Sequence, residues 1–112
     1  MSALSITTPN GTVTISRDVV ADVVADTAAH CYGVVGLSAG TRVGRIFRRE
    51  GISIDGDAQA LRIQVHIVVA HGLNLAEVAS TVRSQVGYEV ERLTGLKVAA
   101  VEVVIERVRQ SA

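Results

Sequence analysis

The sequence has no tryptophan, one phenylalanine and two tyrosines, so aromatic residues make up only 3% of its length. This scarcity disfavours the aromatic stacking surfaces with which many modules bind single-stranded nucleic acid. The single cysteine, Cys31, excludes an internal disulfide bond and a zinc site built from paired cysteines, in agreement with a reducing compartment. We therefore expect an aliphatic core without covalent cross-links.

The sequence also lacks net charge, because 11 basic residues balance 11 acidic ones. This balance disfavours a protein that wraps nucleic acid, since that task requires many phosphates to be neutralised by lysine and arginine. The longest apolar runs, such as Ile67 to Ala70, are far shorter than the roughly 20 residues that cross a bilayer, and the start has no signal-peptide pattern. We expect a cytoplasmic protein without a membrane span of its own.

The length of 112 residues predicts one domain over 1–112, with its core between about residues 10 and 108. A chain of this size can bury roughly 65% of its unfolded surface, which is enough for one core without metal or disulfide support.

The first half predicts a strand, a helix and a loop. Val13 and Ile15 alternate with threonines over 11–16, after a turn at 8–11. Ser16 is a suitable N-cap, and apolar residues at helical spacing up to Cys31 predict a helix over 17–32 that Gly33 ends. Residues 38–50 have no clear period and are expected to form a loop.

The second half predicts a hairpin, a helix and a last strand. Ile52 and Ile54 indicate a strand, 55–57 a turn, and the alternation over 61–69 a second strand with one buried face. Asn74 and Glu77 are spaced as a capping box for a helix that Gly95 ends. Residues 97–108 predict a strand that is covered on much of both faces, because 98–105 are nearly all apolar.

The resulting order, β-α-β-β-α-β, predicts an α+β two-layer sandwich with two helices packed on one face of a mixed sheet. The two halves also align at an offset of 58 or 59 residues, with Val20 on Val78 and Val24 on Val82, and Gly36–Leu37 on Gly95–Leu96. A duplication and a repeated amphipathic pattern both explain this alignment.

Three aspartates, Asp18, Asp22 and Asp26, lie four residues apart and therefore share one face of the first helix. Carboxylates so placed could bind a metal or act as acid and base, or could dock a basic partner. A solvated outer face explains them more simply.

Four arginines, Arg42, Arg45, Arg48 and Arg49, stand near a single acid, Glu50. The glycines around them do not have the spacing of a phosphate-binding loop. Since the chain has ten arginines and one lysine, forked pairing of guanidinium groups with carboxylates is a plausible use. A contact with a protein or an anionic surface and a solvated loop are both open interpretations.

The remaining candidates for chemistry form no recognisable pattern. His30, His66 and His71 have neither the i, i+4 spacing nor the motif of a metal site, and Cys31 is expected to be a buried structural thiol. The residues themselves thus predict no catalytic group, metal or cofactor.

Several segments, taken in order, resemble the alkaline-shock, Gls-type envelope-stress family over about residues 10–108. They are 11–16 before a helix of alanine and valine, 33–37, 68–75, and 93–98 before a valine-rich strand. The glycines at 33, 36, 72 and 95 match the family's pattern and are interpreted as structural.

The resemblance implies a non-enzymatic cytoplasmic protein of cell-envelope homeostasis in Gram-positive bacteria. It further implies self-association and a position at the inner face of the cell membrane, through a separate anchoring protein or a paralogue. It carries over no catalytic residue and no cofactor.

These observations lead to one hypothesis about contacts and one alternative function. The arginines of 42–49 would contact Asp18, Asp22 and Asp26 of another copy. The alternative is a small nucleic-acid-binding α/β module that uses the same arginine-rich loop. A small-molecule enzyme is disfavoured, because no spacing brings polar groups together in a pocket.

Overall fold

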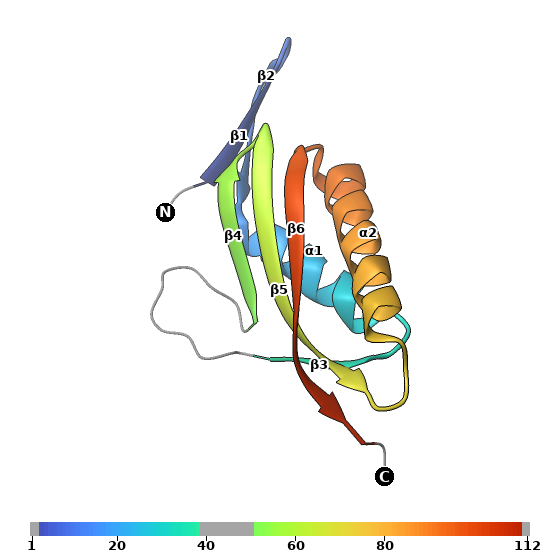
Figure 1. Ribbon diagram of the computed structural model, residues 1–112. Coiled ribbons are helices and arrows are strands. Elements are labelled where there is room, and N and C mark those ends of the chain that lie inside the picture. The colour runs from blue at the N-terminus through green and yellow to red at the C-terminus, as the bar shows by residue number, and fades with distance from the viewer. Residues whose placement is uncertain (1–2, 39–50, 111–112) are drawn as a thin grey trace.

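The computed structural model describes residues 3–38 and 51–110, and it confirms the expected α+β class. Two helices pack on one face of a mixed sheet, and a hairpin projects beyond it (Figure 1). The elements are β1 (Ala3–Thr8), β2 (Gly11–Ser16), α1 (Arg17–Ala29), β3 (Val34–Leu37), β4 (Ile52–Asp57), β5 (Ala60–Ala70), α2 (Leu75–Thr94) and β6 (Val98–Arg109).

The long strand β5 organises the main sheet. On one side it pairs antiparallel with β4 over 60–65 and with β3 over 67–69. On its other side it pairs in parallel with β6, from Leu61 to Ala70. The parallel direction follows from the connection between the two strands, because a helix, α2, carries the chain from one end of the sheet to the other.

The strand β1 was not predicted, although its partner β2 and the turn between them were. The two pair antiparallel from Ala3 with Ser16 to Thr8 with Gly11. Leu4 is 2% exposed and belongs to the core, so part of the core lies before residue 10. Only Leu4 and Ile6 alternate in this segment, which is too short a pattern to indicate a strand by itself.

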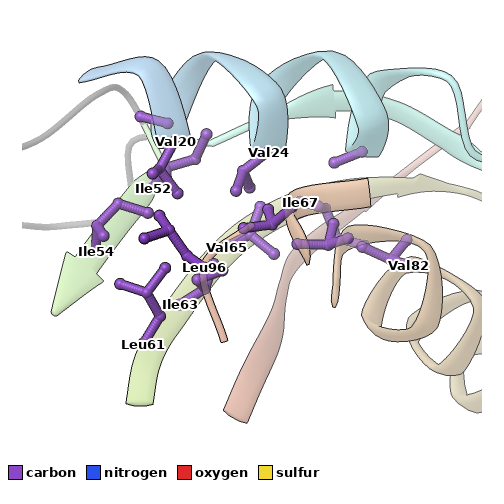
Figure 2. Close-up of a cluster of buried hydrophobic side chains, with 14 of the residues drawn as sticks. Val20, Val24, Ile52, Ile54, Leu61, Ile63, Val65, Ile67, Val82 and Leu96 are labelled. Carbon is purple, nitrogen blue, oxygen red and sulfur yellow. The ribbon is translucent and has the colours of Figure 1, made fainter. Parts of the chain in front are cut away.

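The core lies between the helices and the sheet and is aliphatic. Figure 2 shows side chains of α1, β4, β5 and α2 converging there. No polar or charged side chain is buried within 3–38 and 51–110. Each fully buried valine, leucine or isoleucine contributes about 1.5–3 kcal/mol of transfer free energy. The fully buried residues of β5 share the helix side of the strand: Leu61, Val65, Ile67 and Val69.

Both helices begin at the predicted caps, but α1 ends earlier than predicted. The Ser16 hydroxyl accepts from the Asp18 N–H at 3.0 Å, and the Asn74 side chain accepts from the Glu77 N–H at 3.0 Å. Gly95 ends α2 in the left-handed conformation. The helix α1 was expected to reach residue 32, yet it stops at Ala29.

Gly33 lies in the turn after α1 rather than at the helix end. Its φ is +91°, and a Cβ added there would lie 2.8 Å from the Leu73 side chain. The glycine is therefore needed for a left-handed turn that passes close to the loop before α2. A helix pattern alone cannot locate this end, because Cys31 is partly buried by packing in the turn and so continues the apolar period.

The sequence alignment of the two halves holds for the helices and fails after them. Val20 and Val24 of α1 and Val78 and Val82 of α2 are all buried. Gly36, however, lies within β3, whereas Gly95 caps α2. The correspondence therefore lies in the two helices, which cover the same core.

The turn of the second hairpin lies two residues later than predicted. Residues 55–57 belong to β4, and the turn is at Ala58 and Gln59. The Asp57 carboxylate accepts from the N–H groups of Gln59 and Ala60, at 3.0 and 3.1 Å. Gly56 has a φ of +91°, and an added Cβ would lie 2.2 Å from the Ala60 carbonyl oxygen. The glycine therefore lies within the strand and not in the turn, and its positive φ beside the Ala60 carbonyl oxygen leaves no room for a side chain.

The last strand, β6, differs from the expected strand covered on both faces. None of its residues is buried, and Val108 is 39% exposed. The reason is its position, since β6 pairs with β5 alone among the described strands and forms the edge of the sheet. The apolar composition of β6 therefore does not indicate a strand that is covered on both faces.

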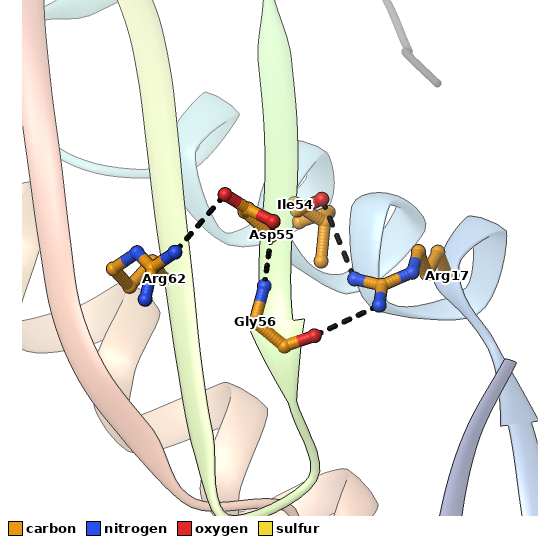
Figure 3. Close-up of polar contacts among 5 residues, drawn as sticks. All are labelled: Arg17, Ile54, Asp55, Gly56 and Arg62. Carbon is orange, nitrogen blue, oxygen red and sulfur yellow. Dashed lines mark hydrogen bonds and ion pairs between the residues drawn. The ribbon is translucent and has the colours of Figure 1, made fainter. Parts of the chain in front are cut away.

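Two arginine side chains, those of Arg17 and Arg62, donate hydrogen bonds to residues of β4 (Figure 3). Arg17, the first residue of α1, donates to the carbonyl oxygens of Gly56 at 2.8 Å and Ile54 at 3.4 Å. Arg62 donates to the Asp55 carboxylate at 3.1 Å, which also accepts from the Gly56 N–H at 2.8 Å. These bonds lower the pKa of Asp55 below its ordinary value of 3.8, the backbone bond from Gly56 first and Arg62 second.

We expect the two leucines near the end of α2 to contribute differently to the free energy of unfolding, because one is buried and the other is exposed. Leu96 is 1% exposed and Leu93 is 55% exposed. Leu96→Ala should lower the free energy of unfolding by about 2–5 kcal/mol, through lost burial and a cavity. The matched variant Leu93→Ala should change it by less than about 0.5 kcal/mol. Urea titration followed by circular dichroism measures both, and equal losses would contradict the assigned core.

We also expect Asp55 to stabilise the fold in a pH-dependent way. Because its folded-state pKa is lowered, the stabilisation is present above the unfolded pKa and is lost as the pH falls through the folded pKa. Asp55→Asn should therefore unfold at a lower urea concentration than the native chain at pH 7. This difference should shrink below about pH 4.

Arg62→Gln serves as the control for the origin of this effect. It removes the ion pair and keeps the bond from Gly56, so it should retain part of the pH dependence. If the difference in the urea concentration of unfolding between the native chain and Asp55→Asn stays constant down to about pH 2–3, the lowered pKa of Asp55 is refuted.

Candidate functional site

The three aspartates predicted to share a helix face all lie on α1 and are all exposed. Asp18 is in the first turn, where a carboxylate is favoured by the partial positive charge of the helix N-terminus. The last turn of α1 contains no basic residue, although Asp26 lies beside His30, which follows the helix end. The placement agrees with both a solvated face and a docking surface.

Asp22 and Asp26 border a groove between α1 and α2 that the sequence did not reveal. The groove has a volume of about 690 Å³ and is open to solvent. Residues of α2 spaced by three or four, from Thr81 to Leu93, form its other wall. Asp18 is not among the lining residues, so the structure brings two of the three aspartates together with α2.

Both apolar and charged side chains line this groove. Tyr32 is 79% exposed and Leu93 is 55% exposed. Asp26 and His30 are 3.7 Å apart, and His30 also contacts the Asp26 carbonyl oxygen through Nδ1 at 2.8 Å. On α2, Arg92 donates to Glu89 at 2.7 Å. Both contacts join residues three or four positions apart, and neither joins α1 to α2.

Cys31 lies at the same groove, and its thiol is not activated. Burial raises the pKa of Cys31 above its ordinary value, and its Sγ donates to the Thr27 carbonyl oxygen at 3.4 Å. A raised pKa lowers the fraction of reactive thiolate at neutral pH. Cys31 is thus only partly buried, and not fully buried as predicted, because it lies in the turn after α1.

A second polar cluster lies on the sheet face opposite the helices. Gln64 donates to Glu102 at 2.9 Å, and His66 contacts both Gln64 and the Glu106 carboxylate. These residues come from β5 and β6, whose parallel register places Gln64 beside Glu102. Sequence reasoning missed the cluster because only the strand pairing joins residues 38 and 40 positions apart.

No group of three or more histidine, cysteine, aspartate or glutamate side chains within 3–38 and 51–110 is arranged to hold a metal ion. The three histidines have separate surroundings: His30 is beside Asp26, His66 is on the sheet, and His71 is exposed after β5. Arg42, Arg45, Arg48 and Arg49 lie outside the described residues. None of the helices in the described part combines the length and hydropathy that a membrane span needs.

Comparison with known proteins assigns the chain to a family. Residues 5–110 match the alkaline shock protein 23 family, whose description is a cell envelope-related function. The uncharacterized protein YloU of Bacillus subtilis (strain 168) is 30% identical over 115 residues, covering 96% of this chain and 96% of the relative. The uncharacterized protein Spy1614 of Streptococcus pyogenes is 25% identical over 114 residues, covering 95% and 94%.

Solved structures agree on the fold. Two structures of the MamM CTD, one of them a variant, superpose with a TM-score of 0.52 at 15% sequence identity. They cover 81% of this chain and 96% and 98% of their own chains. At this identity the likeness concerns the arrangement of helices and strands alone. The family match over almost the whole chain, together with the α+β fold, shows that this chain belongs to the alkaline shock protein 23 family, a family with a cell envelope-related function and not a known family of enzymes.

Proposed function

We propose that this chain is a non-enzymatic cytoplasmic protein of cell-envelope homeostasis, a self-associating scaffold held at the inner face of the membrane by a separate anchoring protein or paralogue. The observation that carries the proposal is the family match over residues 5–110 and its cell envelope-related description. The whole chain, as one alkaline-shock-like domain, would perform this role. The proposal includes a Gram-positive source for this chain. The two relatives come from Bacillus subtilis and Streptococcus pyogenes, which are Gram-positive bacteria.

The distribution of charge supports self-association. The acidic side chains of Asp18, Asp22 and Asp26 are exposed on one helix, whereas four arginines are concentrated in 42–49. Because the chain has no net charge, two copies do not repel each other overall, and unlike patches can attract. We propose that these arginines contact the aspartates of a neighbouring copy.

The nucleic-acid alternative finds less support. Its binding surface would be the open sheet face or the arginine-rich segment 42–49. The six strands of the described part contain no phenylalanine, tyrosine or tryptophan, so the sheet offers no aromatic platform for bases. We therefore keep the scaffold as the proposed function.

Charge reversal tests the contact between copies. Arg45→Glu with Arg48→Glu should weaken self-association about tenfold or more and should reduce its dependence on salt, because attraction between the patches is replaced by repulsion. Sedimentation equilibrium at low and high salt measures both effects. Arg83→Glu, a charge reversal at an exposed position of α2, is the matched control and should have little effect.

Adding Asp22→Lys to the double reversal should restore association by placing lysine opposite glutamate. If the double variant Arg45→Glu with Arg48→Glu leaves self-association and its salt dependence unchanged, the contact between these arginines and the aspartates is refuted.

The anchoring partner is tested in native cells. The tagged chain is captured after gentle solubilisation and nuclease treatment, and bound proteins are identified by mass spectrometry. We expect an integral membrane protein or a paralogue, whose deletion should release this chain from the membrane fraction. Recovery of ribosomal or nucleic-acid-binding proteins that nuclease treatment removes would instead favour the alternative function.

A further inference from the structure

The outer edge of β6 is long and has no strand partner within residues 3–38 and 51–110. The strand spans twelve residues and pairs only with β5 among the described strands. An edge of this length presents a row of backbone groups that can pair with another strand. At its start, the Glu91 carboxylate accepts from the Val98 N–H at 2.9 Å and closes the edge there.

Natural proteins usually protect such edges with bulges and charges, and β6 has both, but near its ends. The register against β5 shifts at Ala99 and at Glu106, which are the extra residues of two bulges. Between them, residues 100–105 continue in regular register and contain one charge, Glu102. The protection therefore leaves the middle of the edge available.

The side chains of β6 are also incompletely covered. Val101, Val103 and Ile105 pack against the core, but all three remain partly exposed. Val108 is 39% exposed. A strand added beside β6 would bury more of this apolar row, which favours association.

We propose that two copies of this chain pair through β6 in antiparallel fashion, with Val104 on the two-fold axis. The proposal rests on the self-association proposed above and adds a second surface to it, separate from the contact between arginines and aspartates. The two-fold axis stands perpendicular to the sheet, so residues that face each other lie on the same face of the joined sheet. Val103 then lies opposite the partner's Ile105, and both belong to the helix side.

Charge favours this register over those centred at Glu102 and Val103. With Val104 on the axis, Glu102 lies opposite the partner's bulge of Glu106 and Arg107. Glu106 is already engaged by His66 in its own chain, whereas Arg107 faces the same side of the sheet as Glu102. Each interface thus contains two pairs of Glu102 with Arg107.

The registers centred at Glu102 and Val103 are less favourable, whereas an axis at Ile105 would pair Glu102 with the partner's Arg109, and the cross-linking position below separates that case from an axis at Val104. An axis at Glu102 would place two carboxylates directly opposite each other, which destabilises paired strands. An axis at Val103 would place Glu102 opposite an apolar residue, Val104, without a charged partner.

A charge swap within the chain tests the pairing. Glu102→Arg and Arg107→Glu, each alone, should raise the dissociation constant about tenfold or more, because two attractive pairs become two repulsive ones. The double variant should return to within about threefold of the native value, since the pairs are restored with exchanged signs. Sedimentation equilibrium gives the constants, and Arg83→Glu is again the control outside the interface.

Cysteine cross-linking tests the position of the axis. In a Cys31→Ser chain, Val104→Cys should form a disulfide-linked dimer under mild oxidation, because directly opposed residues of antiparallel strands lie within disulfide range. Ala100→Cys is the matched control. It faces the partner's Arg109 in this register and should not cross-link.

The outcomes separate this inference from the proposed function. If the native chain stays monomeric at every concentration, both self-association and the β6 interface are refuted. If it self-associates, yet neither charge reversal nor the double swap changes the constant and the Val104→Cys chain does not cross-link, the β6 interface alone is overturned. Rescue by the swap together with cross-linking of the Val104→Cys chain supports the β6 interface in the proposed register.

Discussion

The whole fold depends on burial of the helix side of β5. Leu61, Val65, Ile67 and Val69 are fully buried there under α1 and α2, and β3, β4 and β6 all pair with this one strand. Shifting β5 by one residue would bring Arg62 and Gln64 into the core. The register of the neighbouring strands, and with it the position of every surface described above, is therefore fixed by the alternation of a single strand.

Elements with a strong local signal were predictable from the sequence. The caps at Ser16 and Asn74 and the alternation in β5 each depend on residues close together in the chain, and the structure contains all three. The failures have non-local causes. The strand β1 depends on pairing with β2, and the exposure of β6 depends on its having one strand neighbour in the described part. An apolar run gives no information about how many neighbours it will have.

The candidate site was predictable in part for the same reason. Helical spacing was sufficient to place Asp18, Asp22 and Asp26 on an exposed face of α1. It could not reveal that α2 approaches two of them to form a groove, nor that His66 meets Glu106 across two strands. Arg42, Arg45, Arg48 and Arg49 lie outside the described residues, so their role rests on composition.

The placement of both helices on one face of the sheet gives the molecule two chemically different sides. One side carries the acidic helix and the groove with Tyr32 and Leu93, and the other carries the polar ladder of Gln64, His66 and Glu102. Two copies paired through β6 around an axis perpendicular to the sheet would keep the same orientation. Such a dimer would carry both acidic helices and both grooves on one side and both polar ladders on the other.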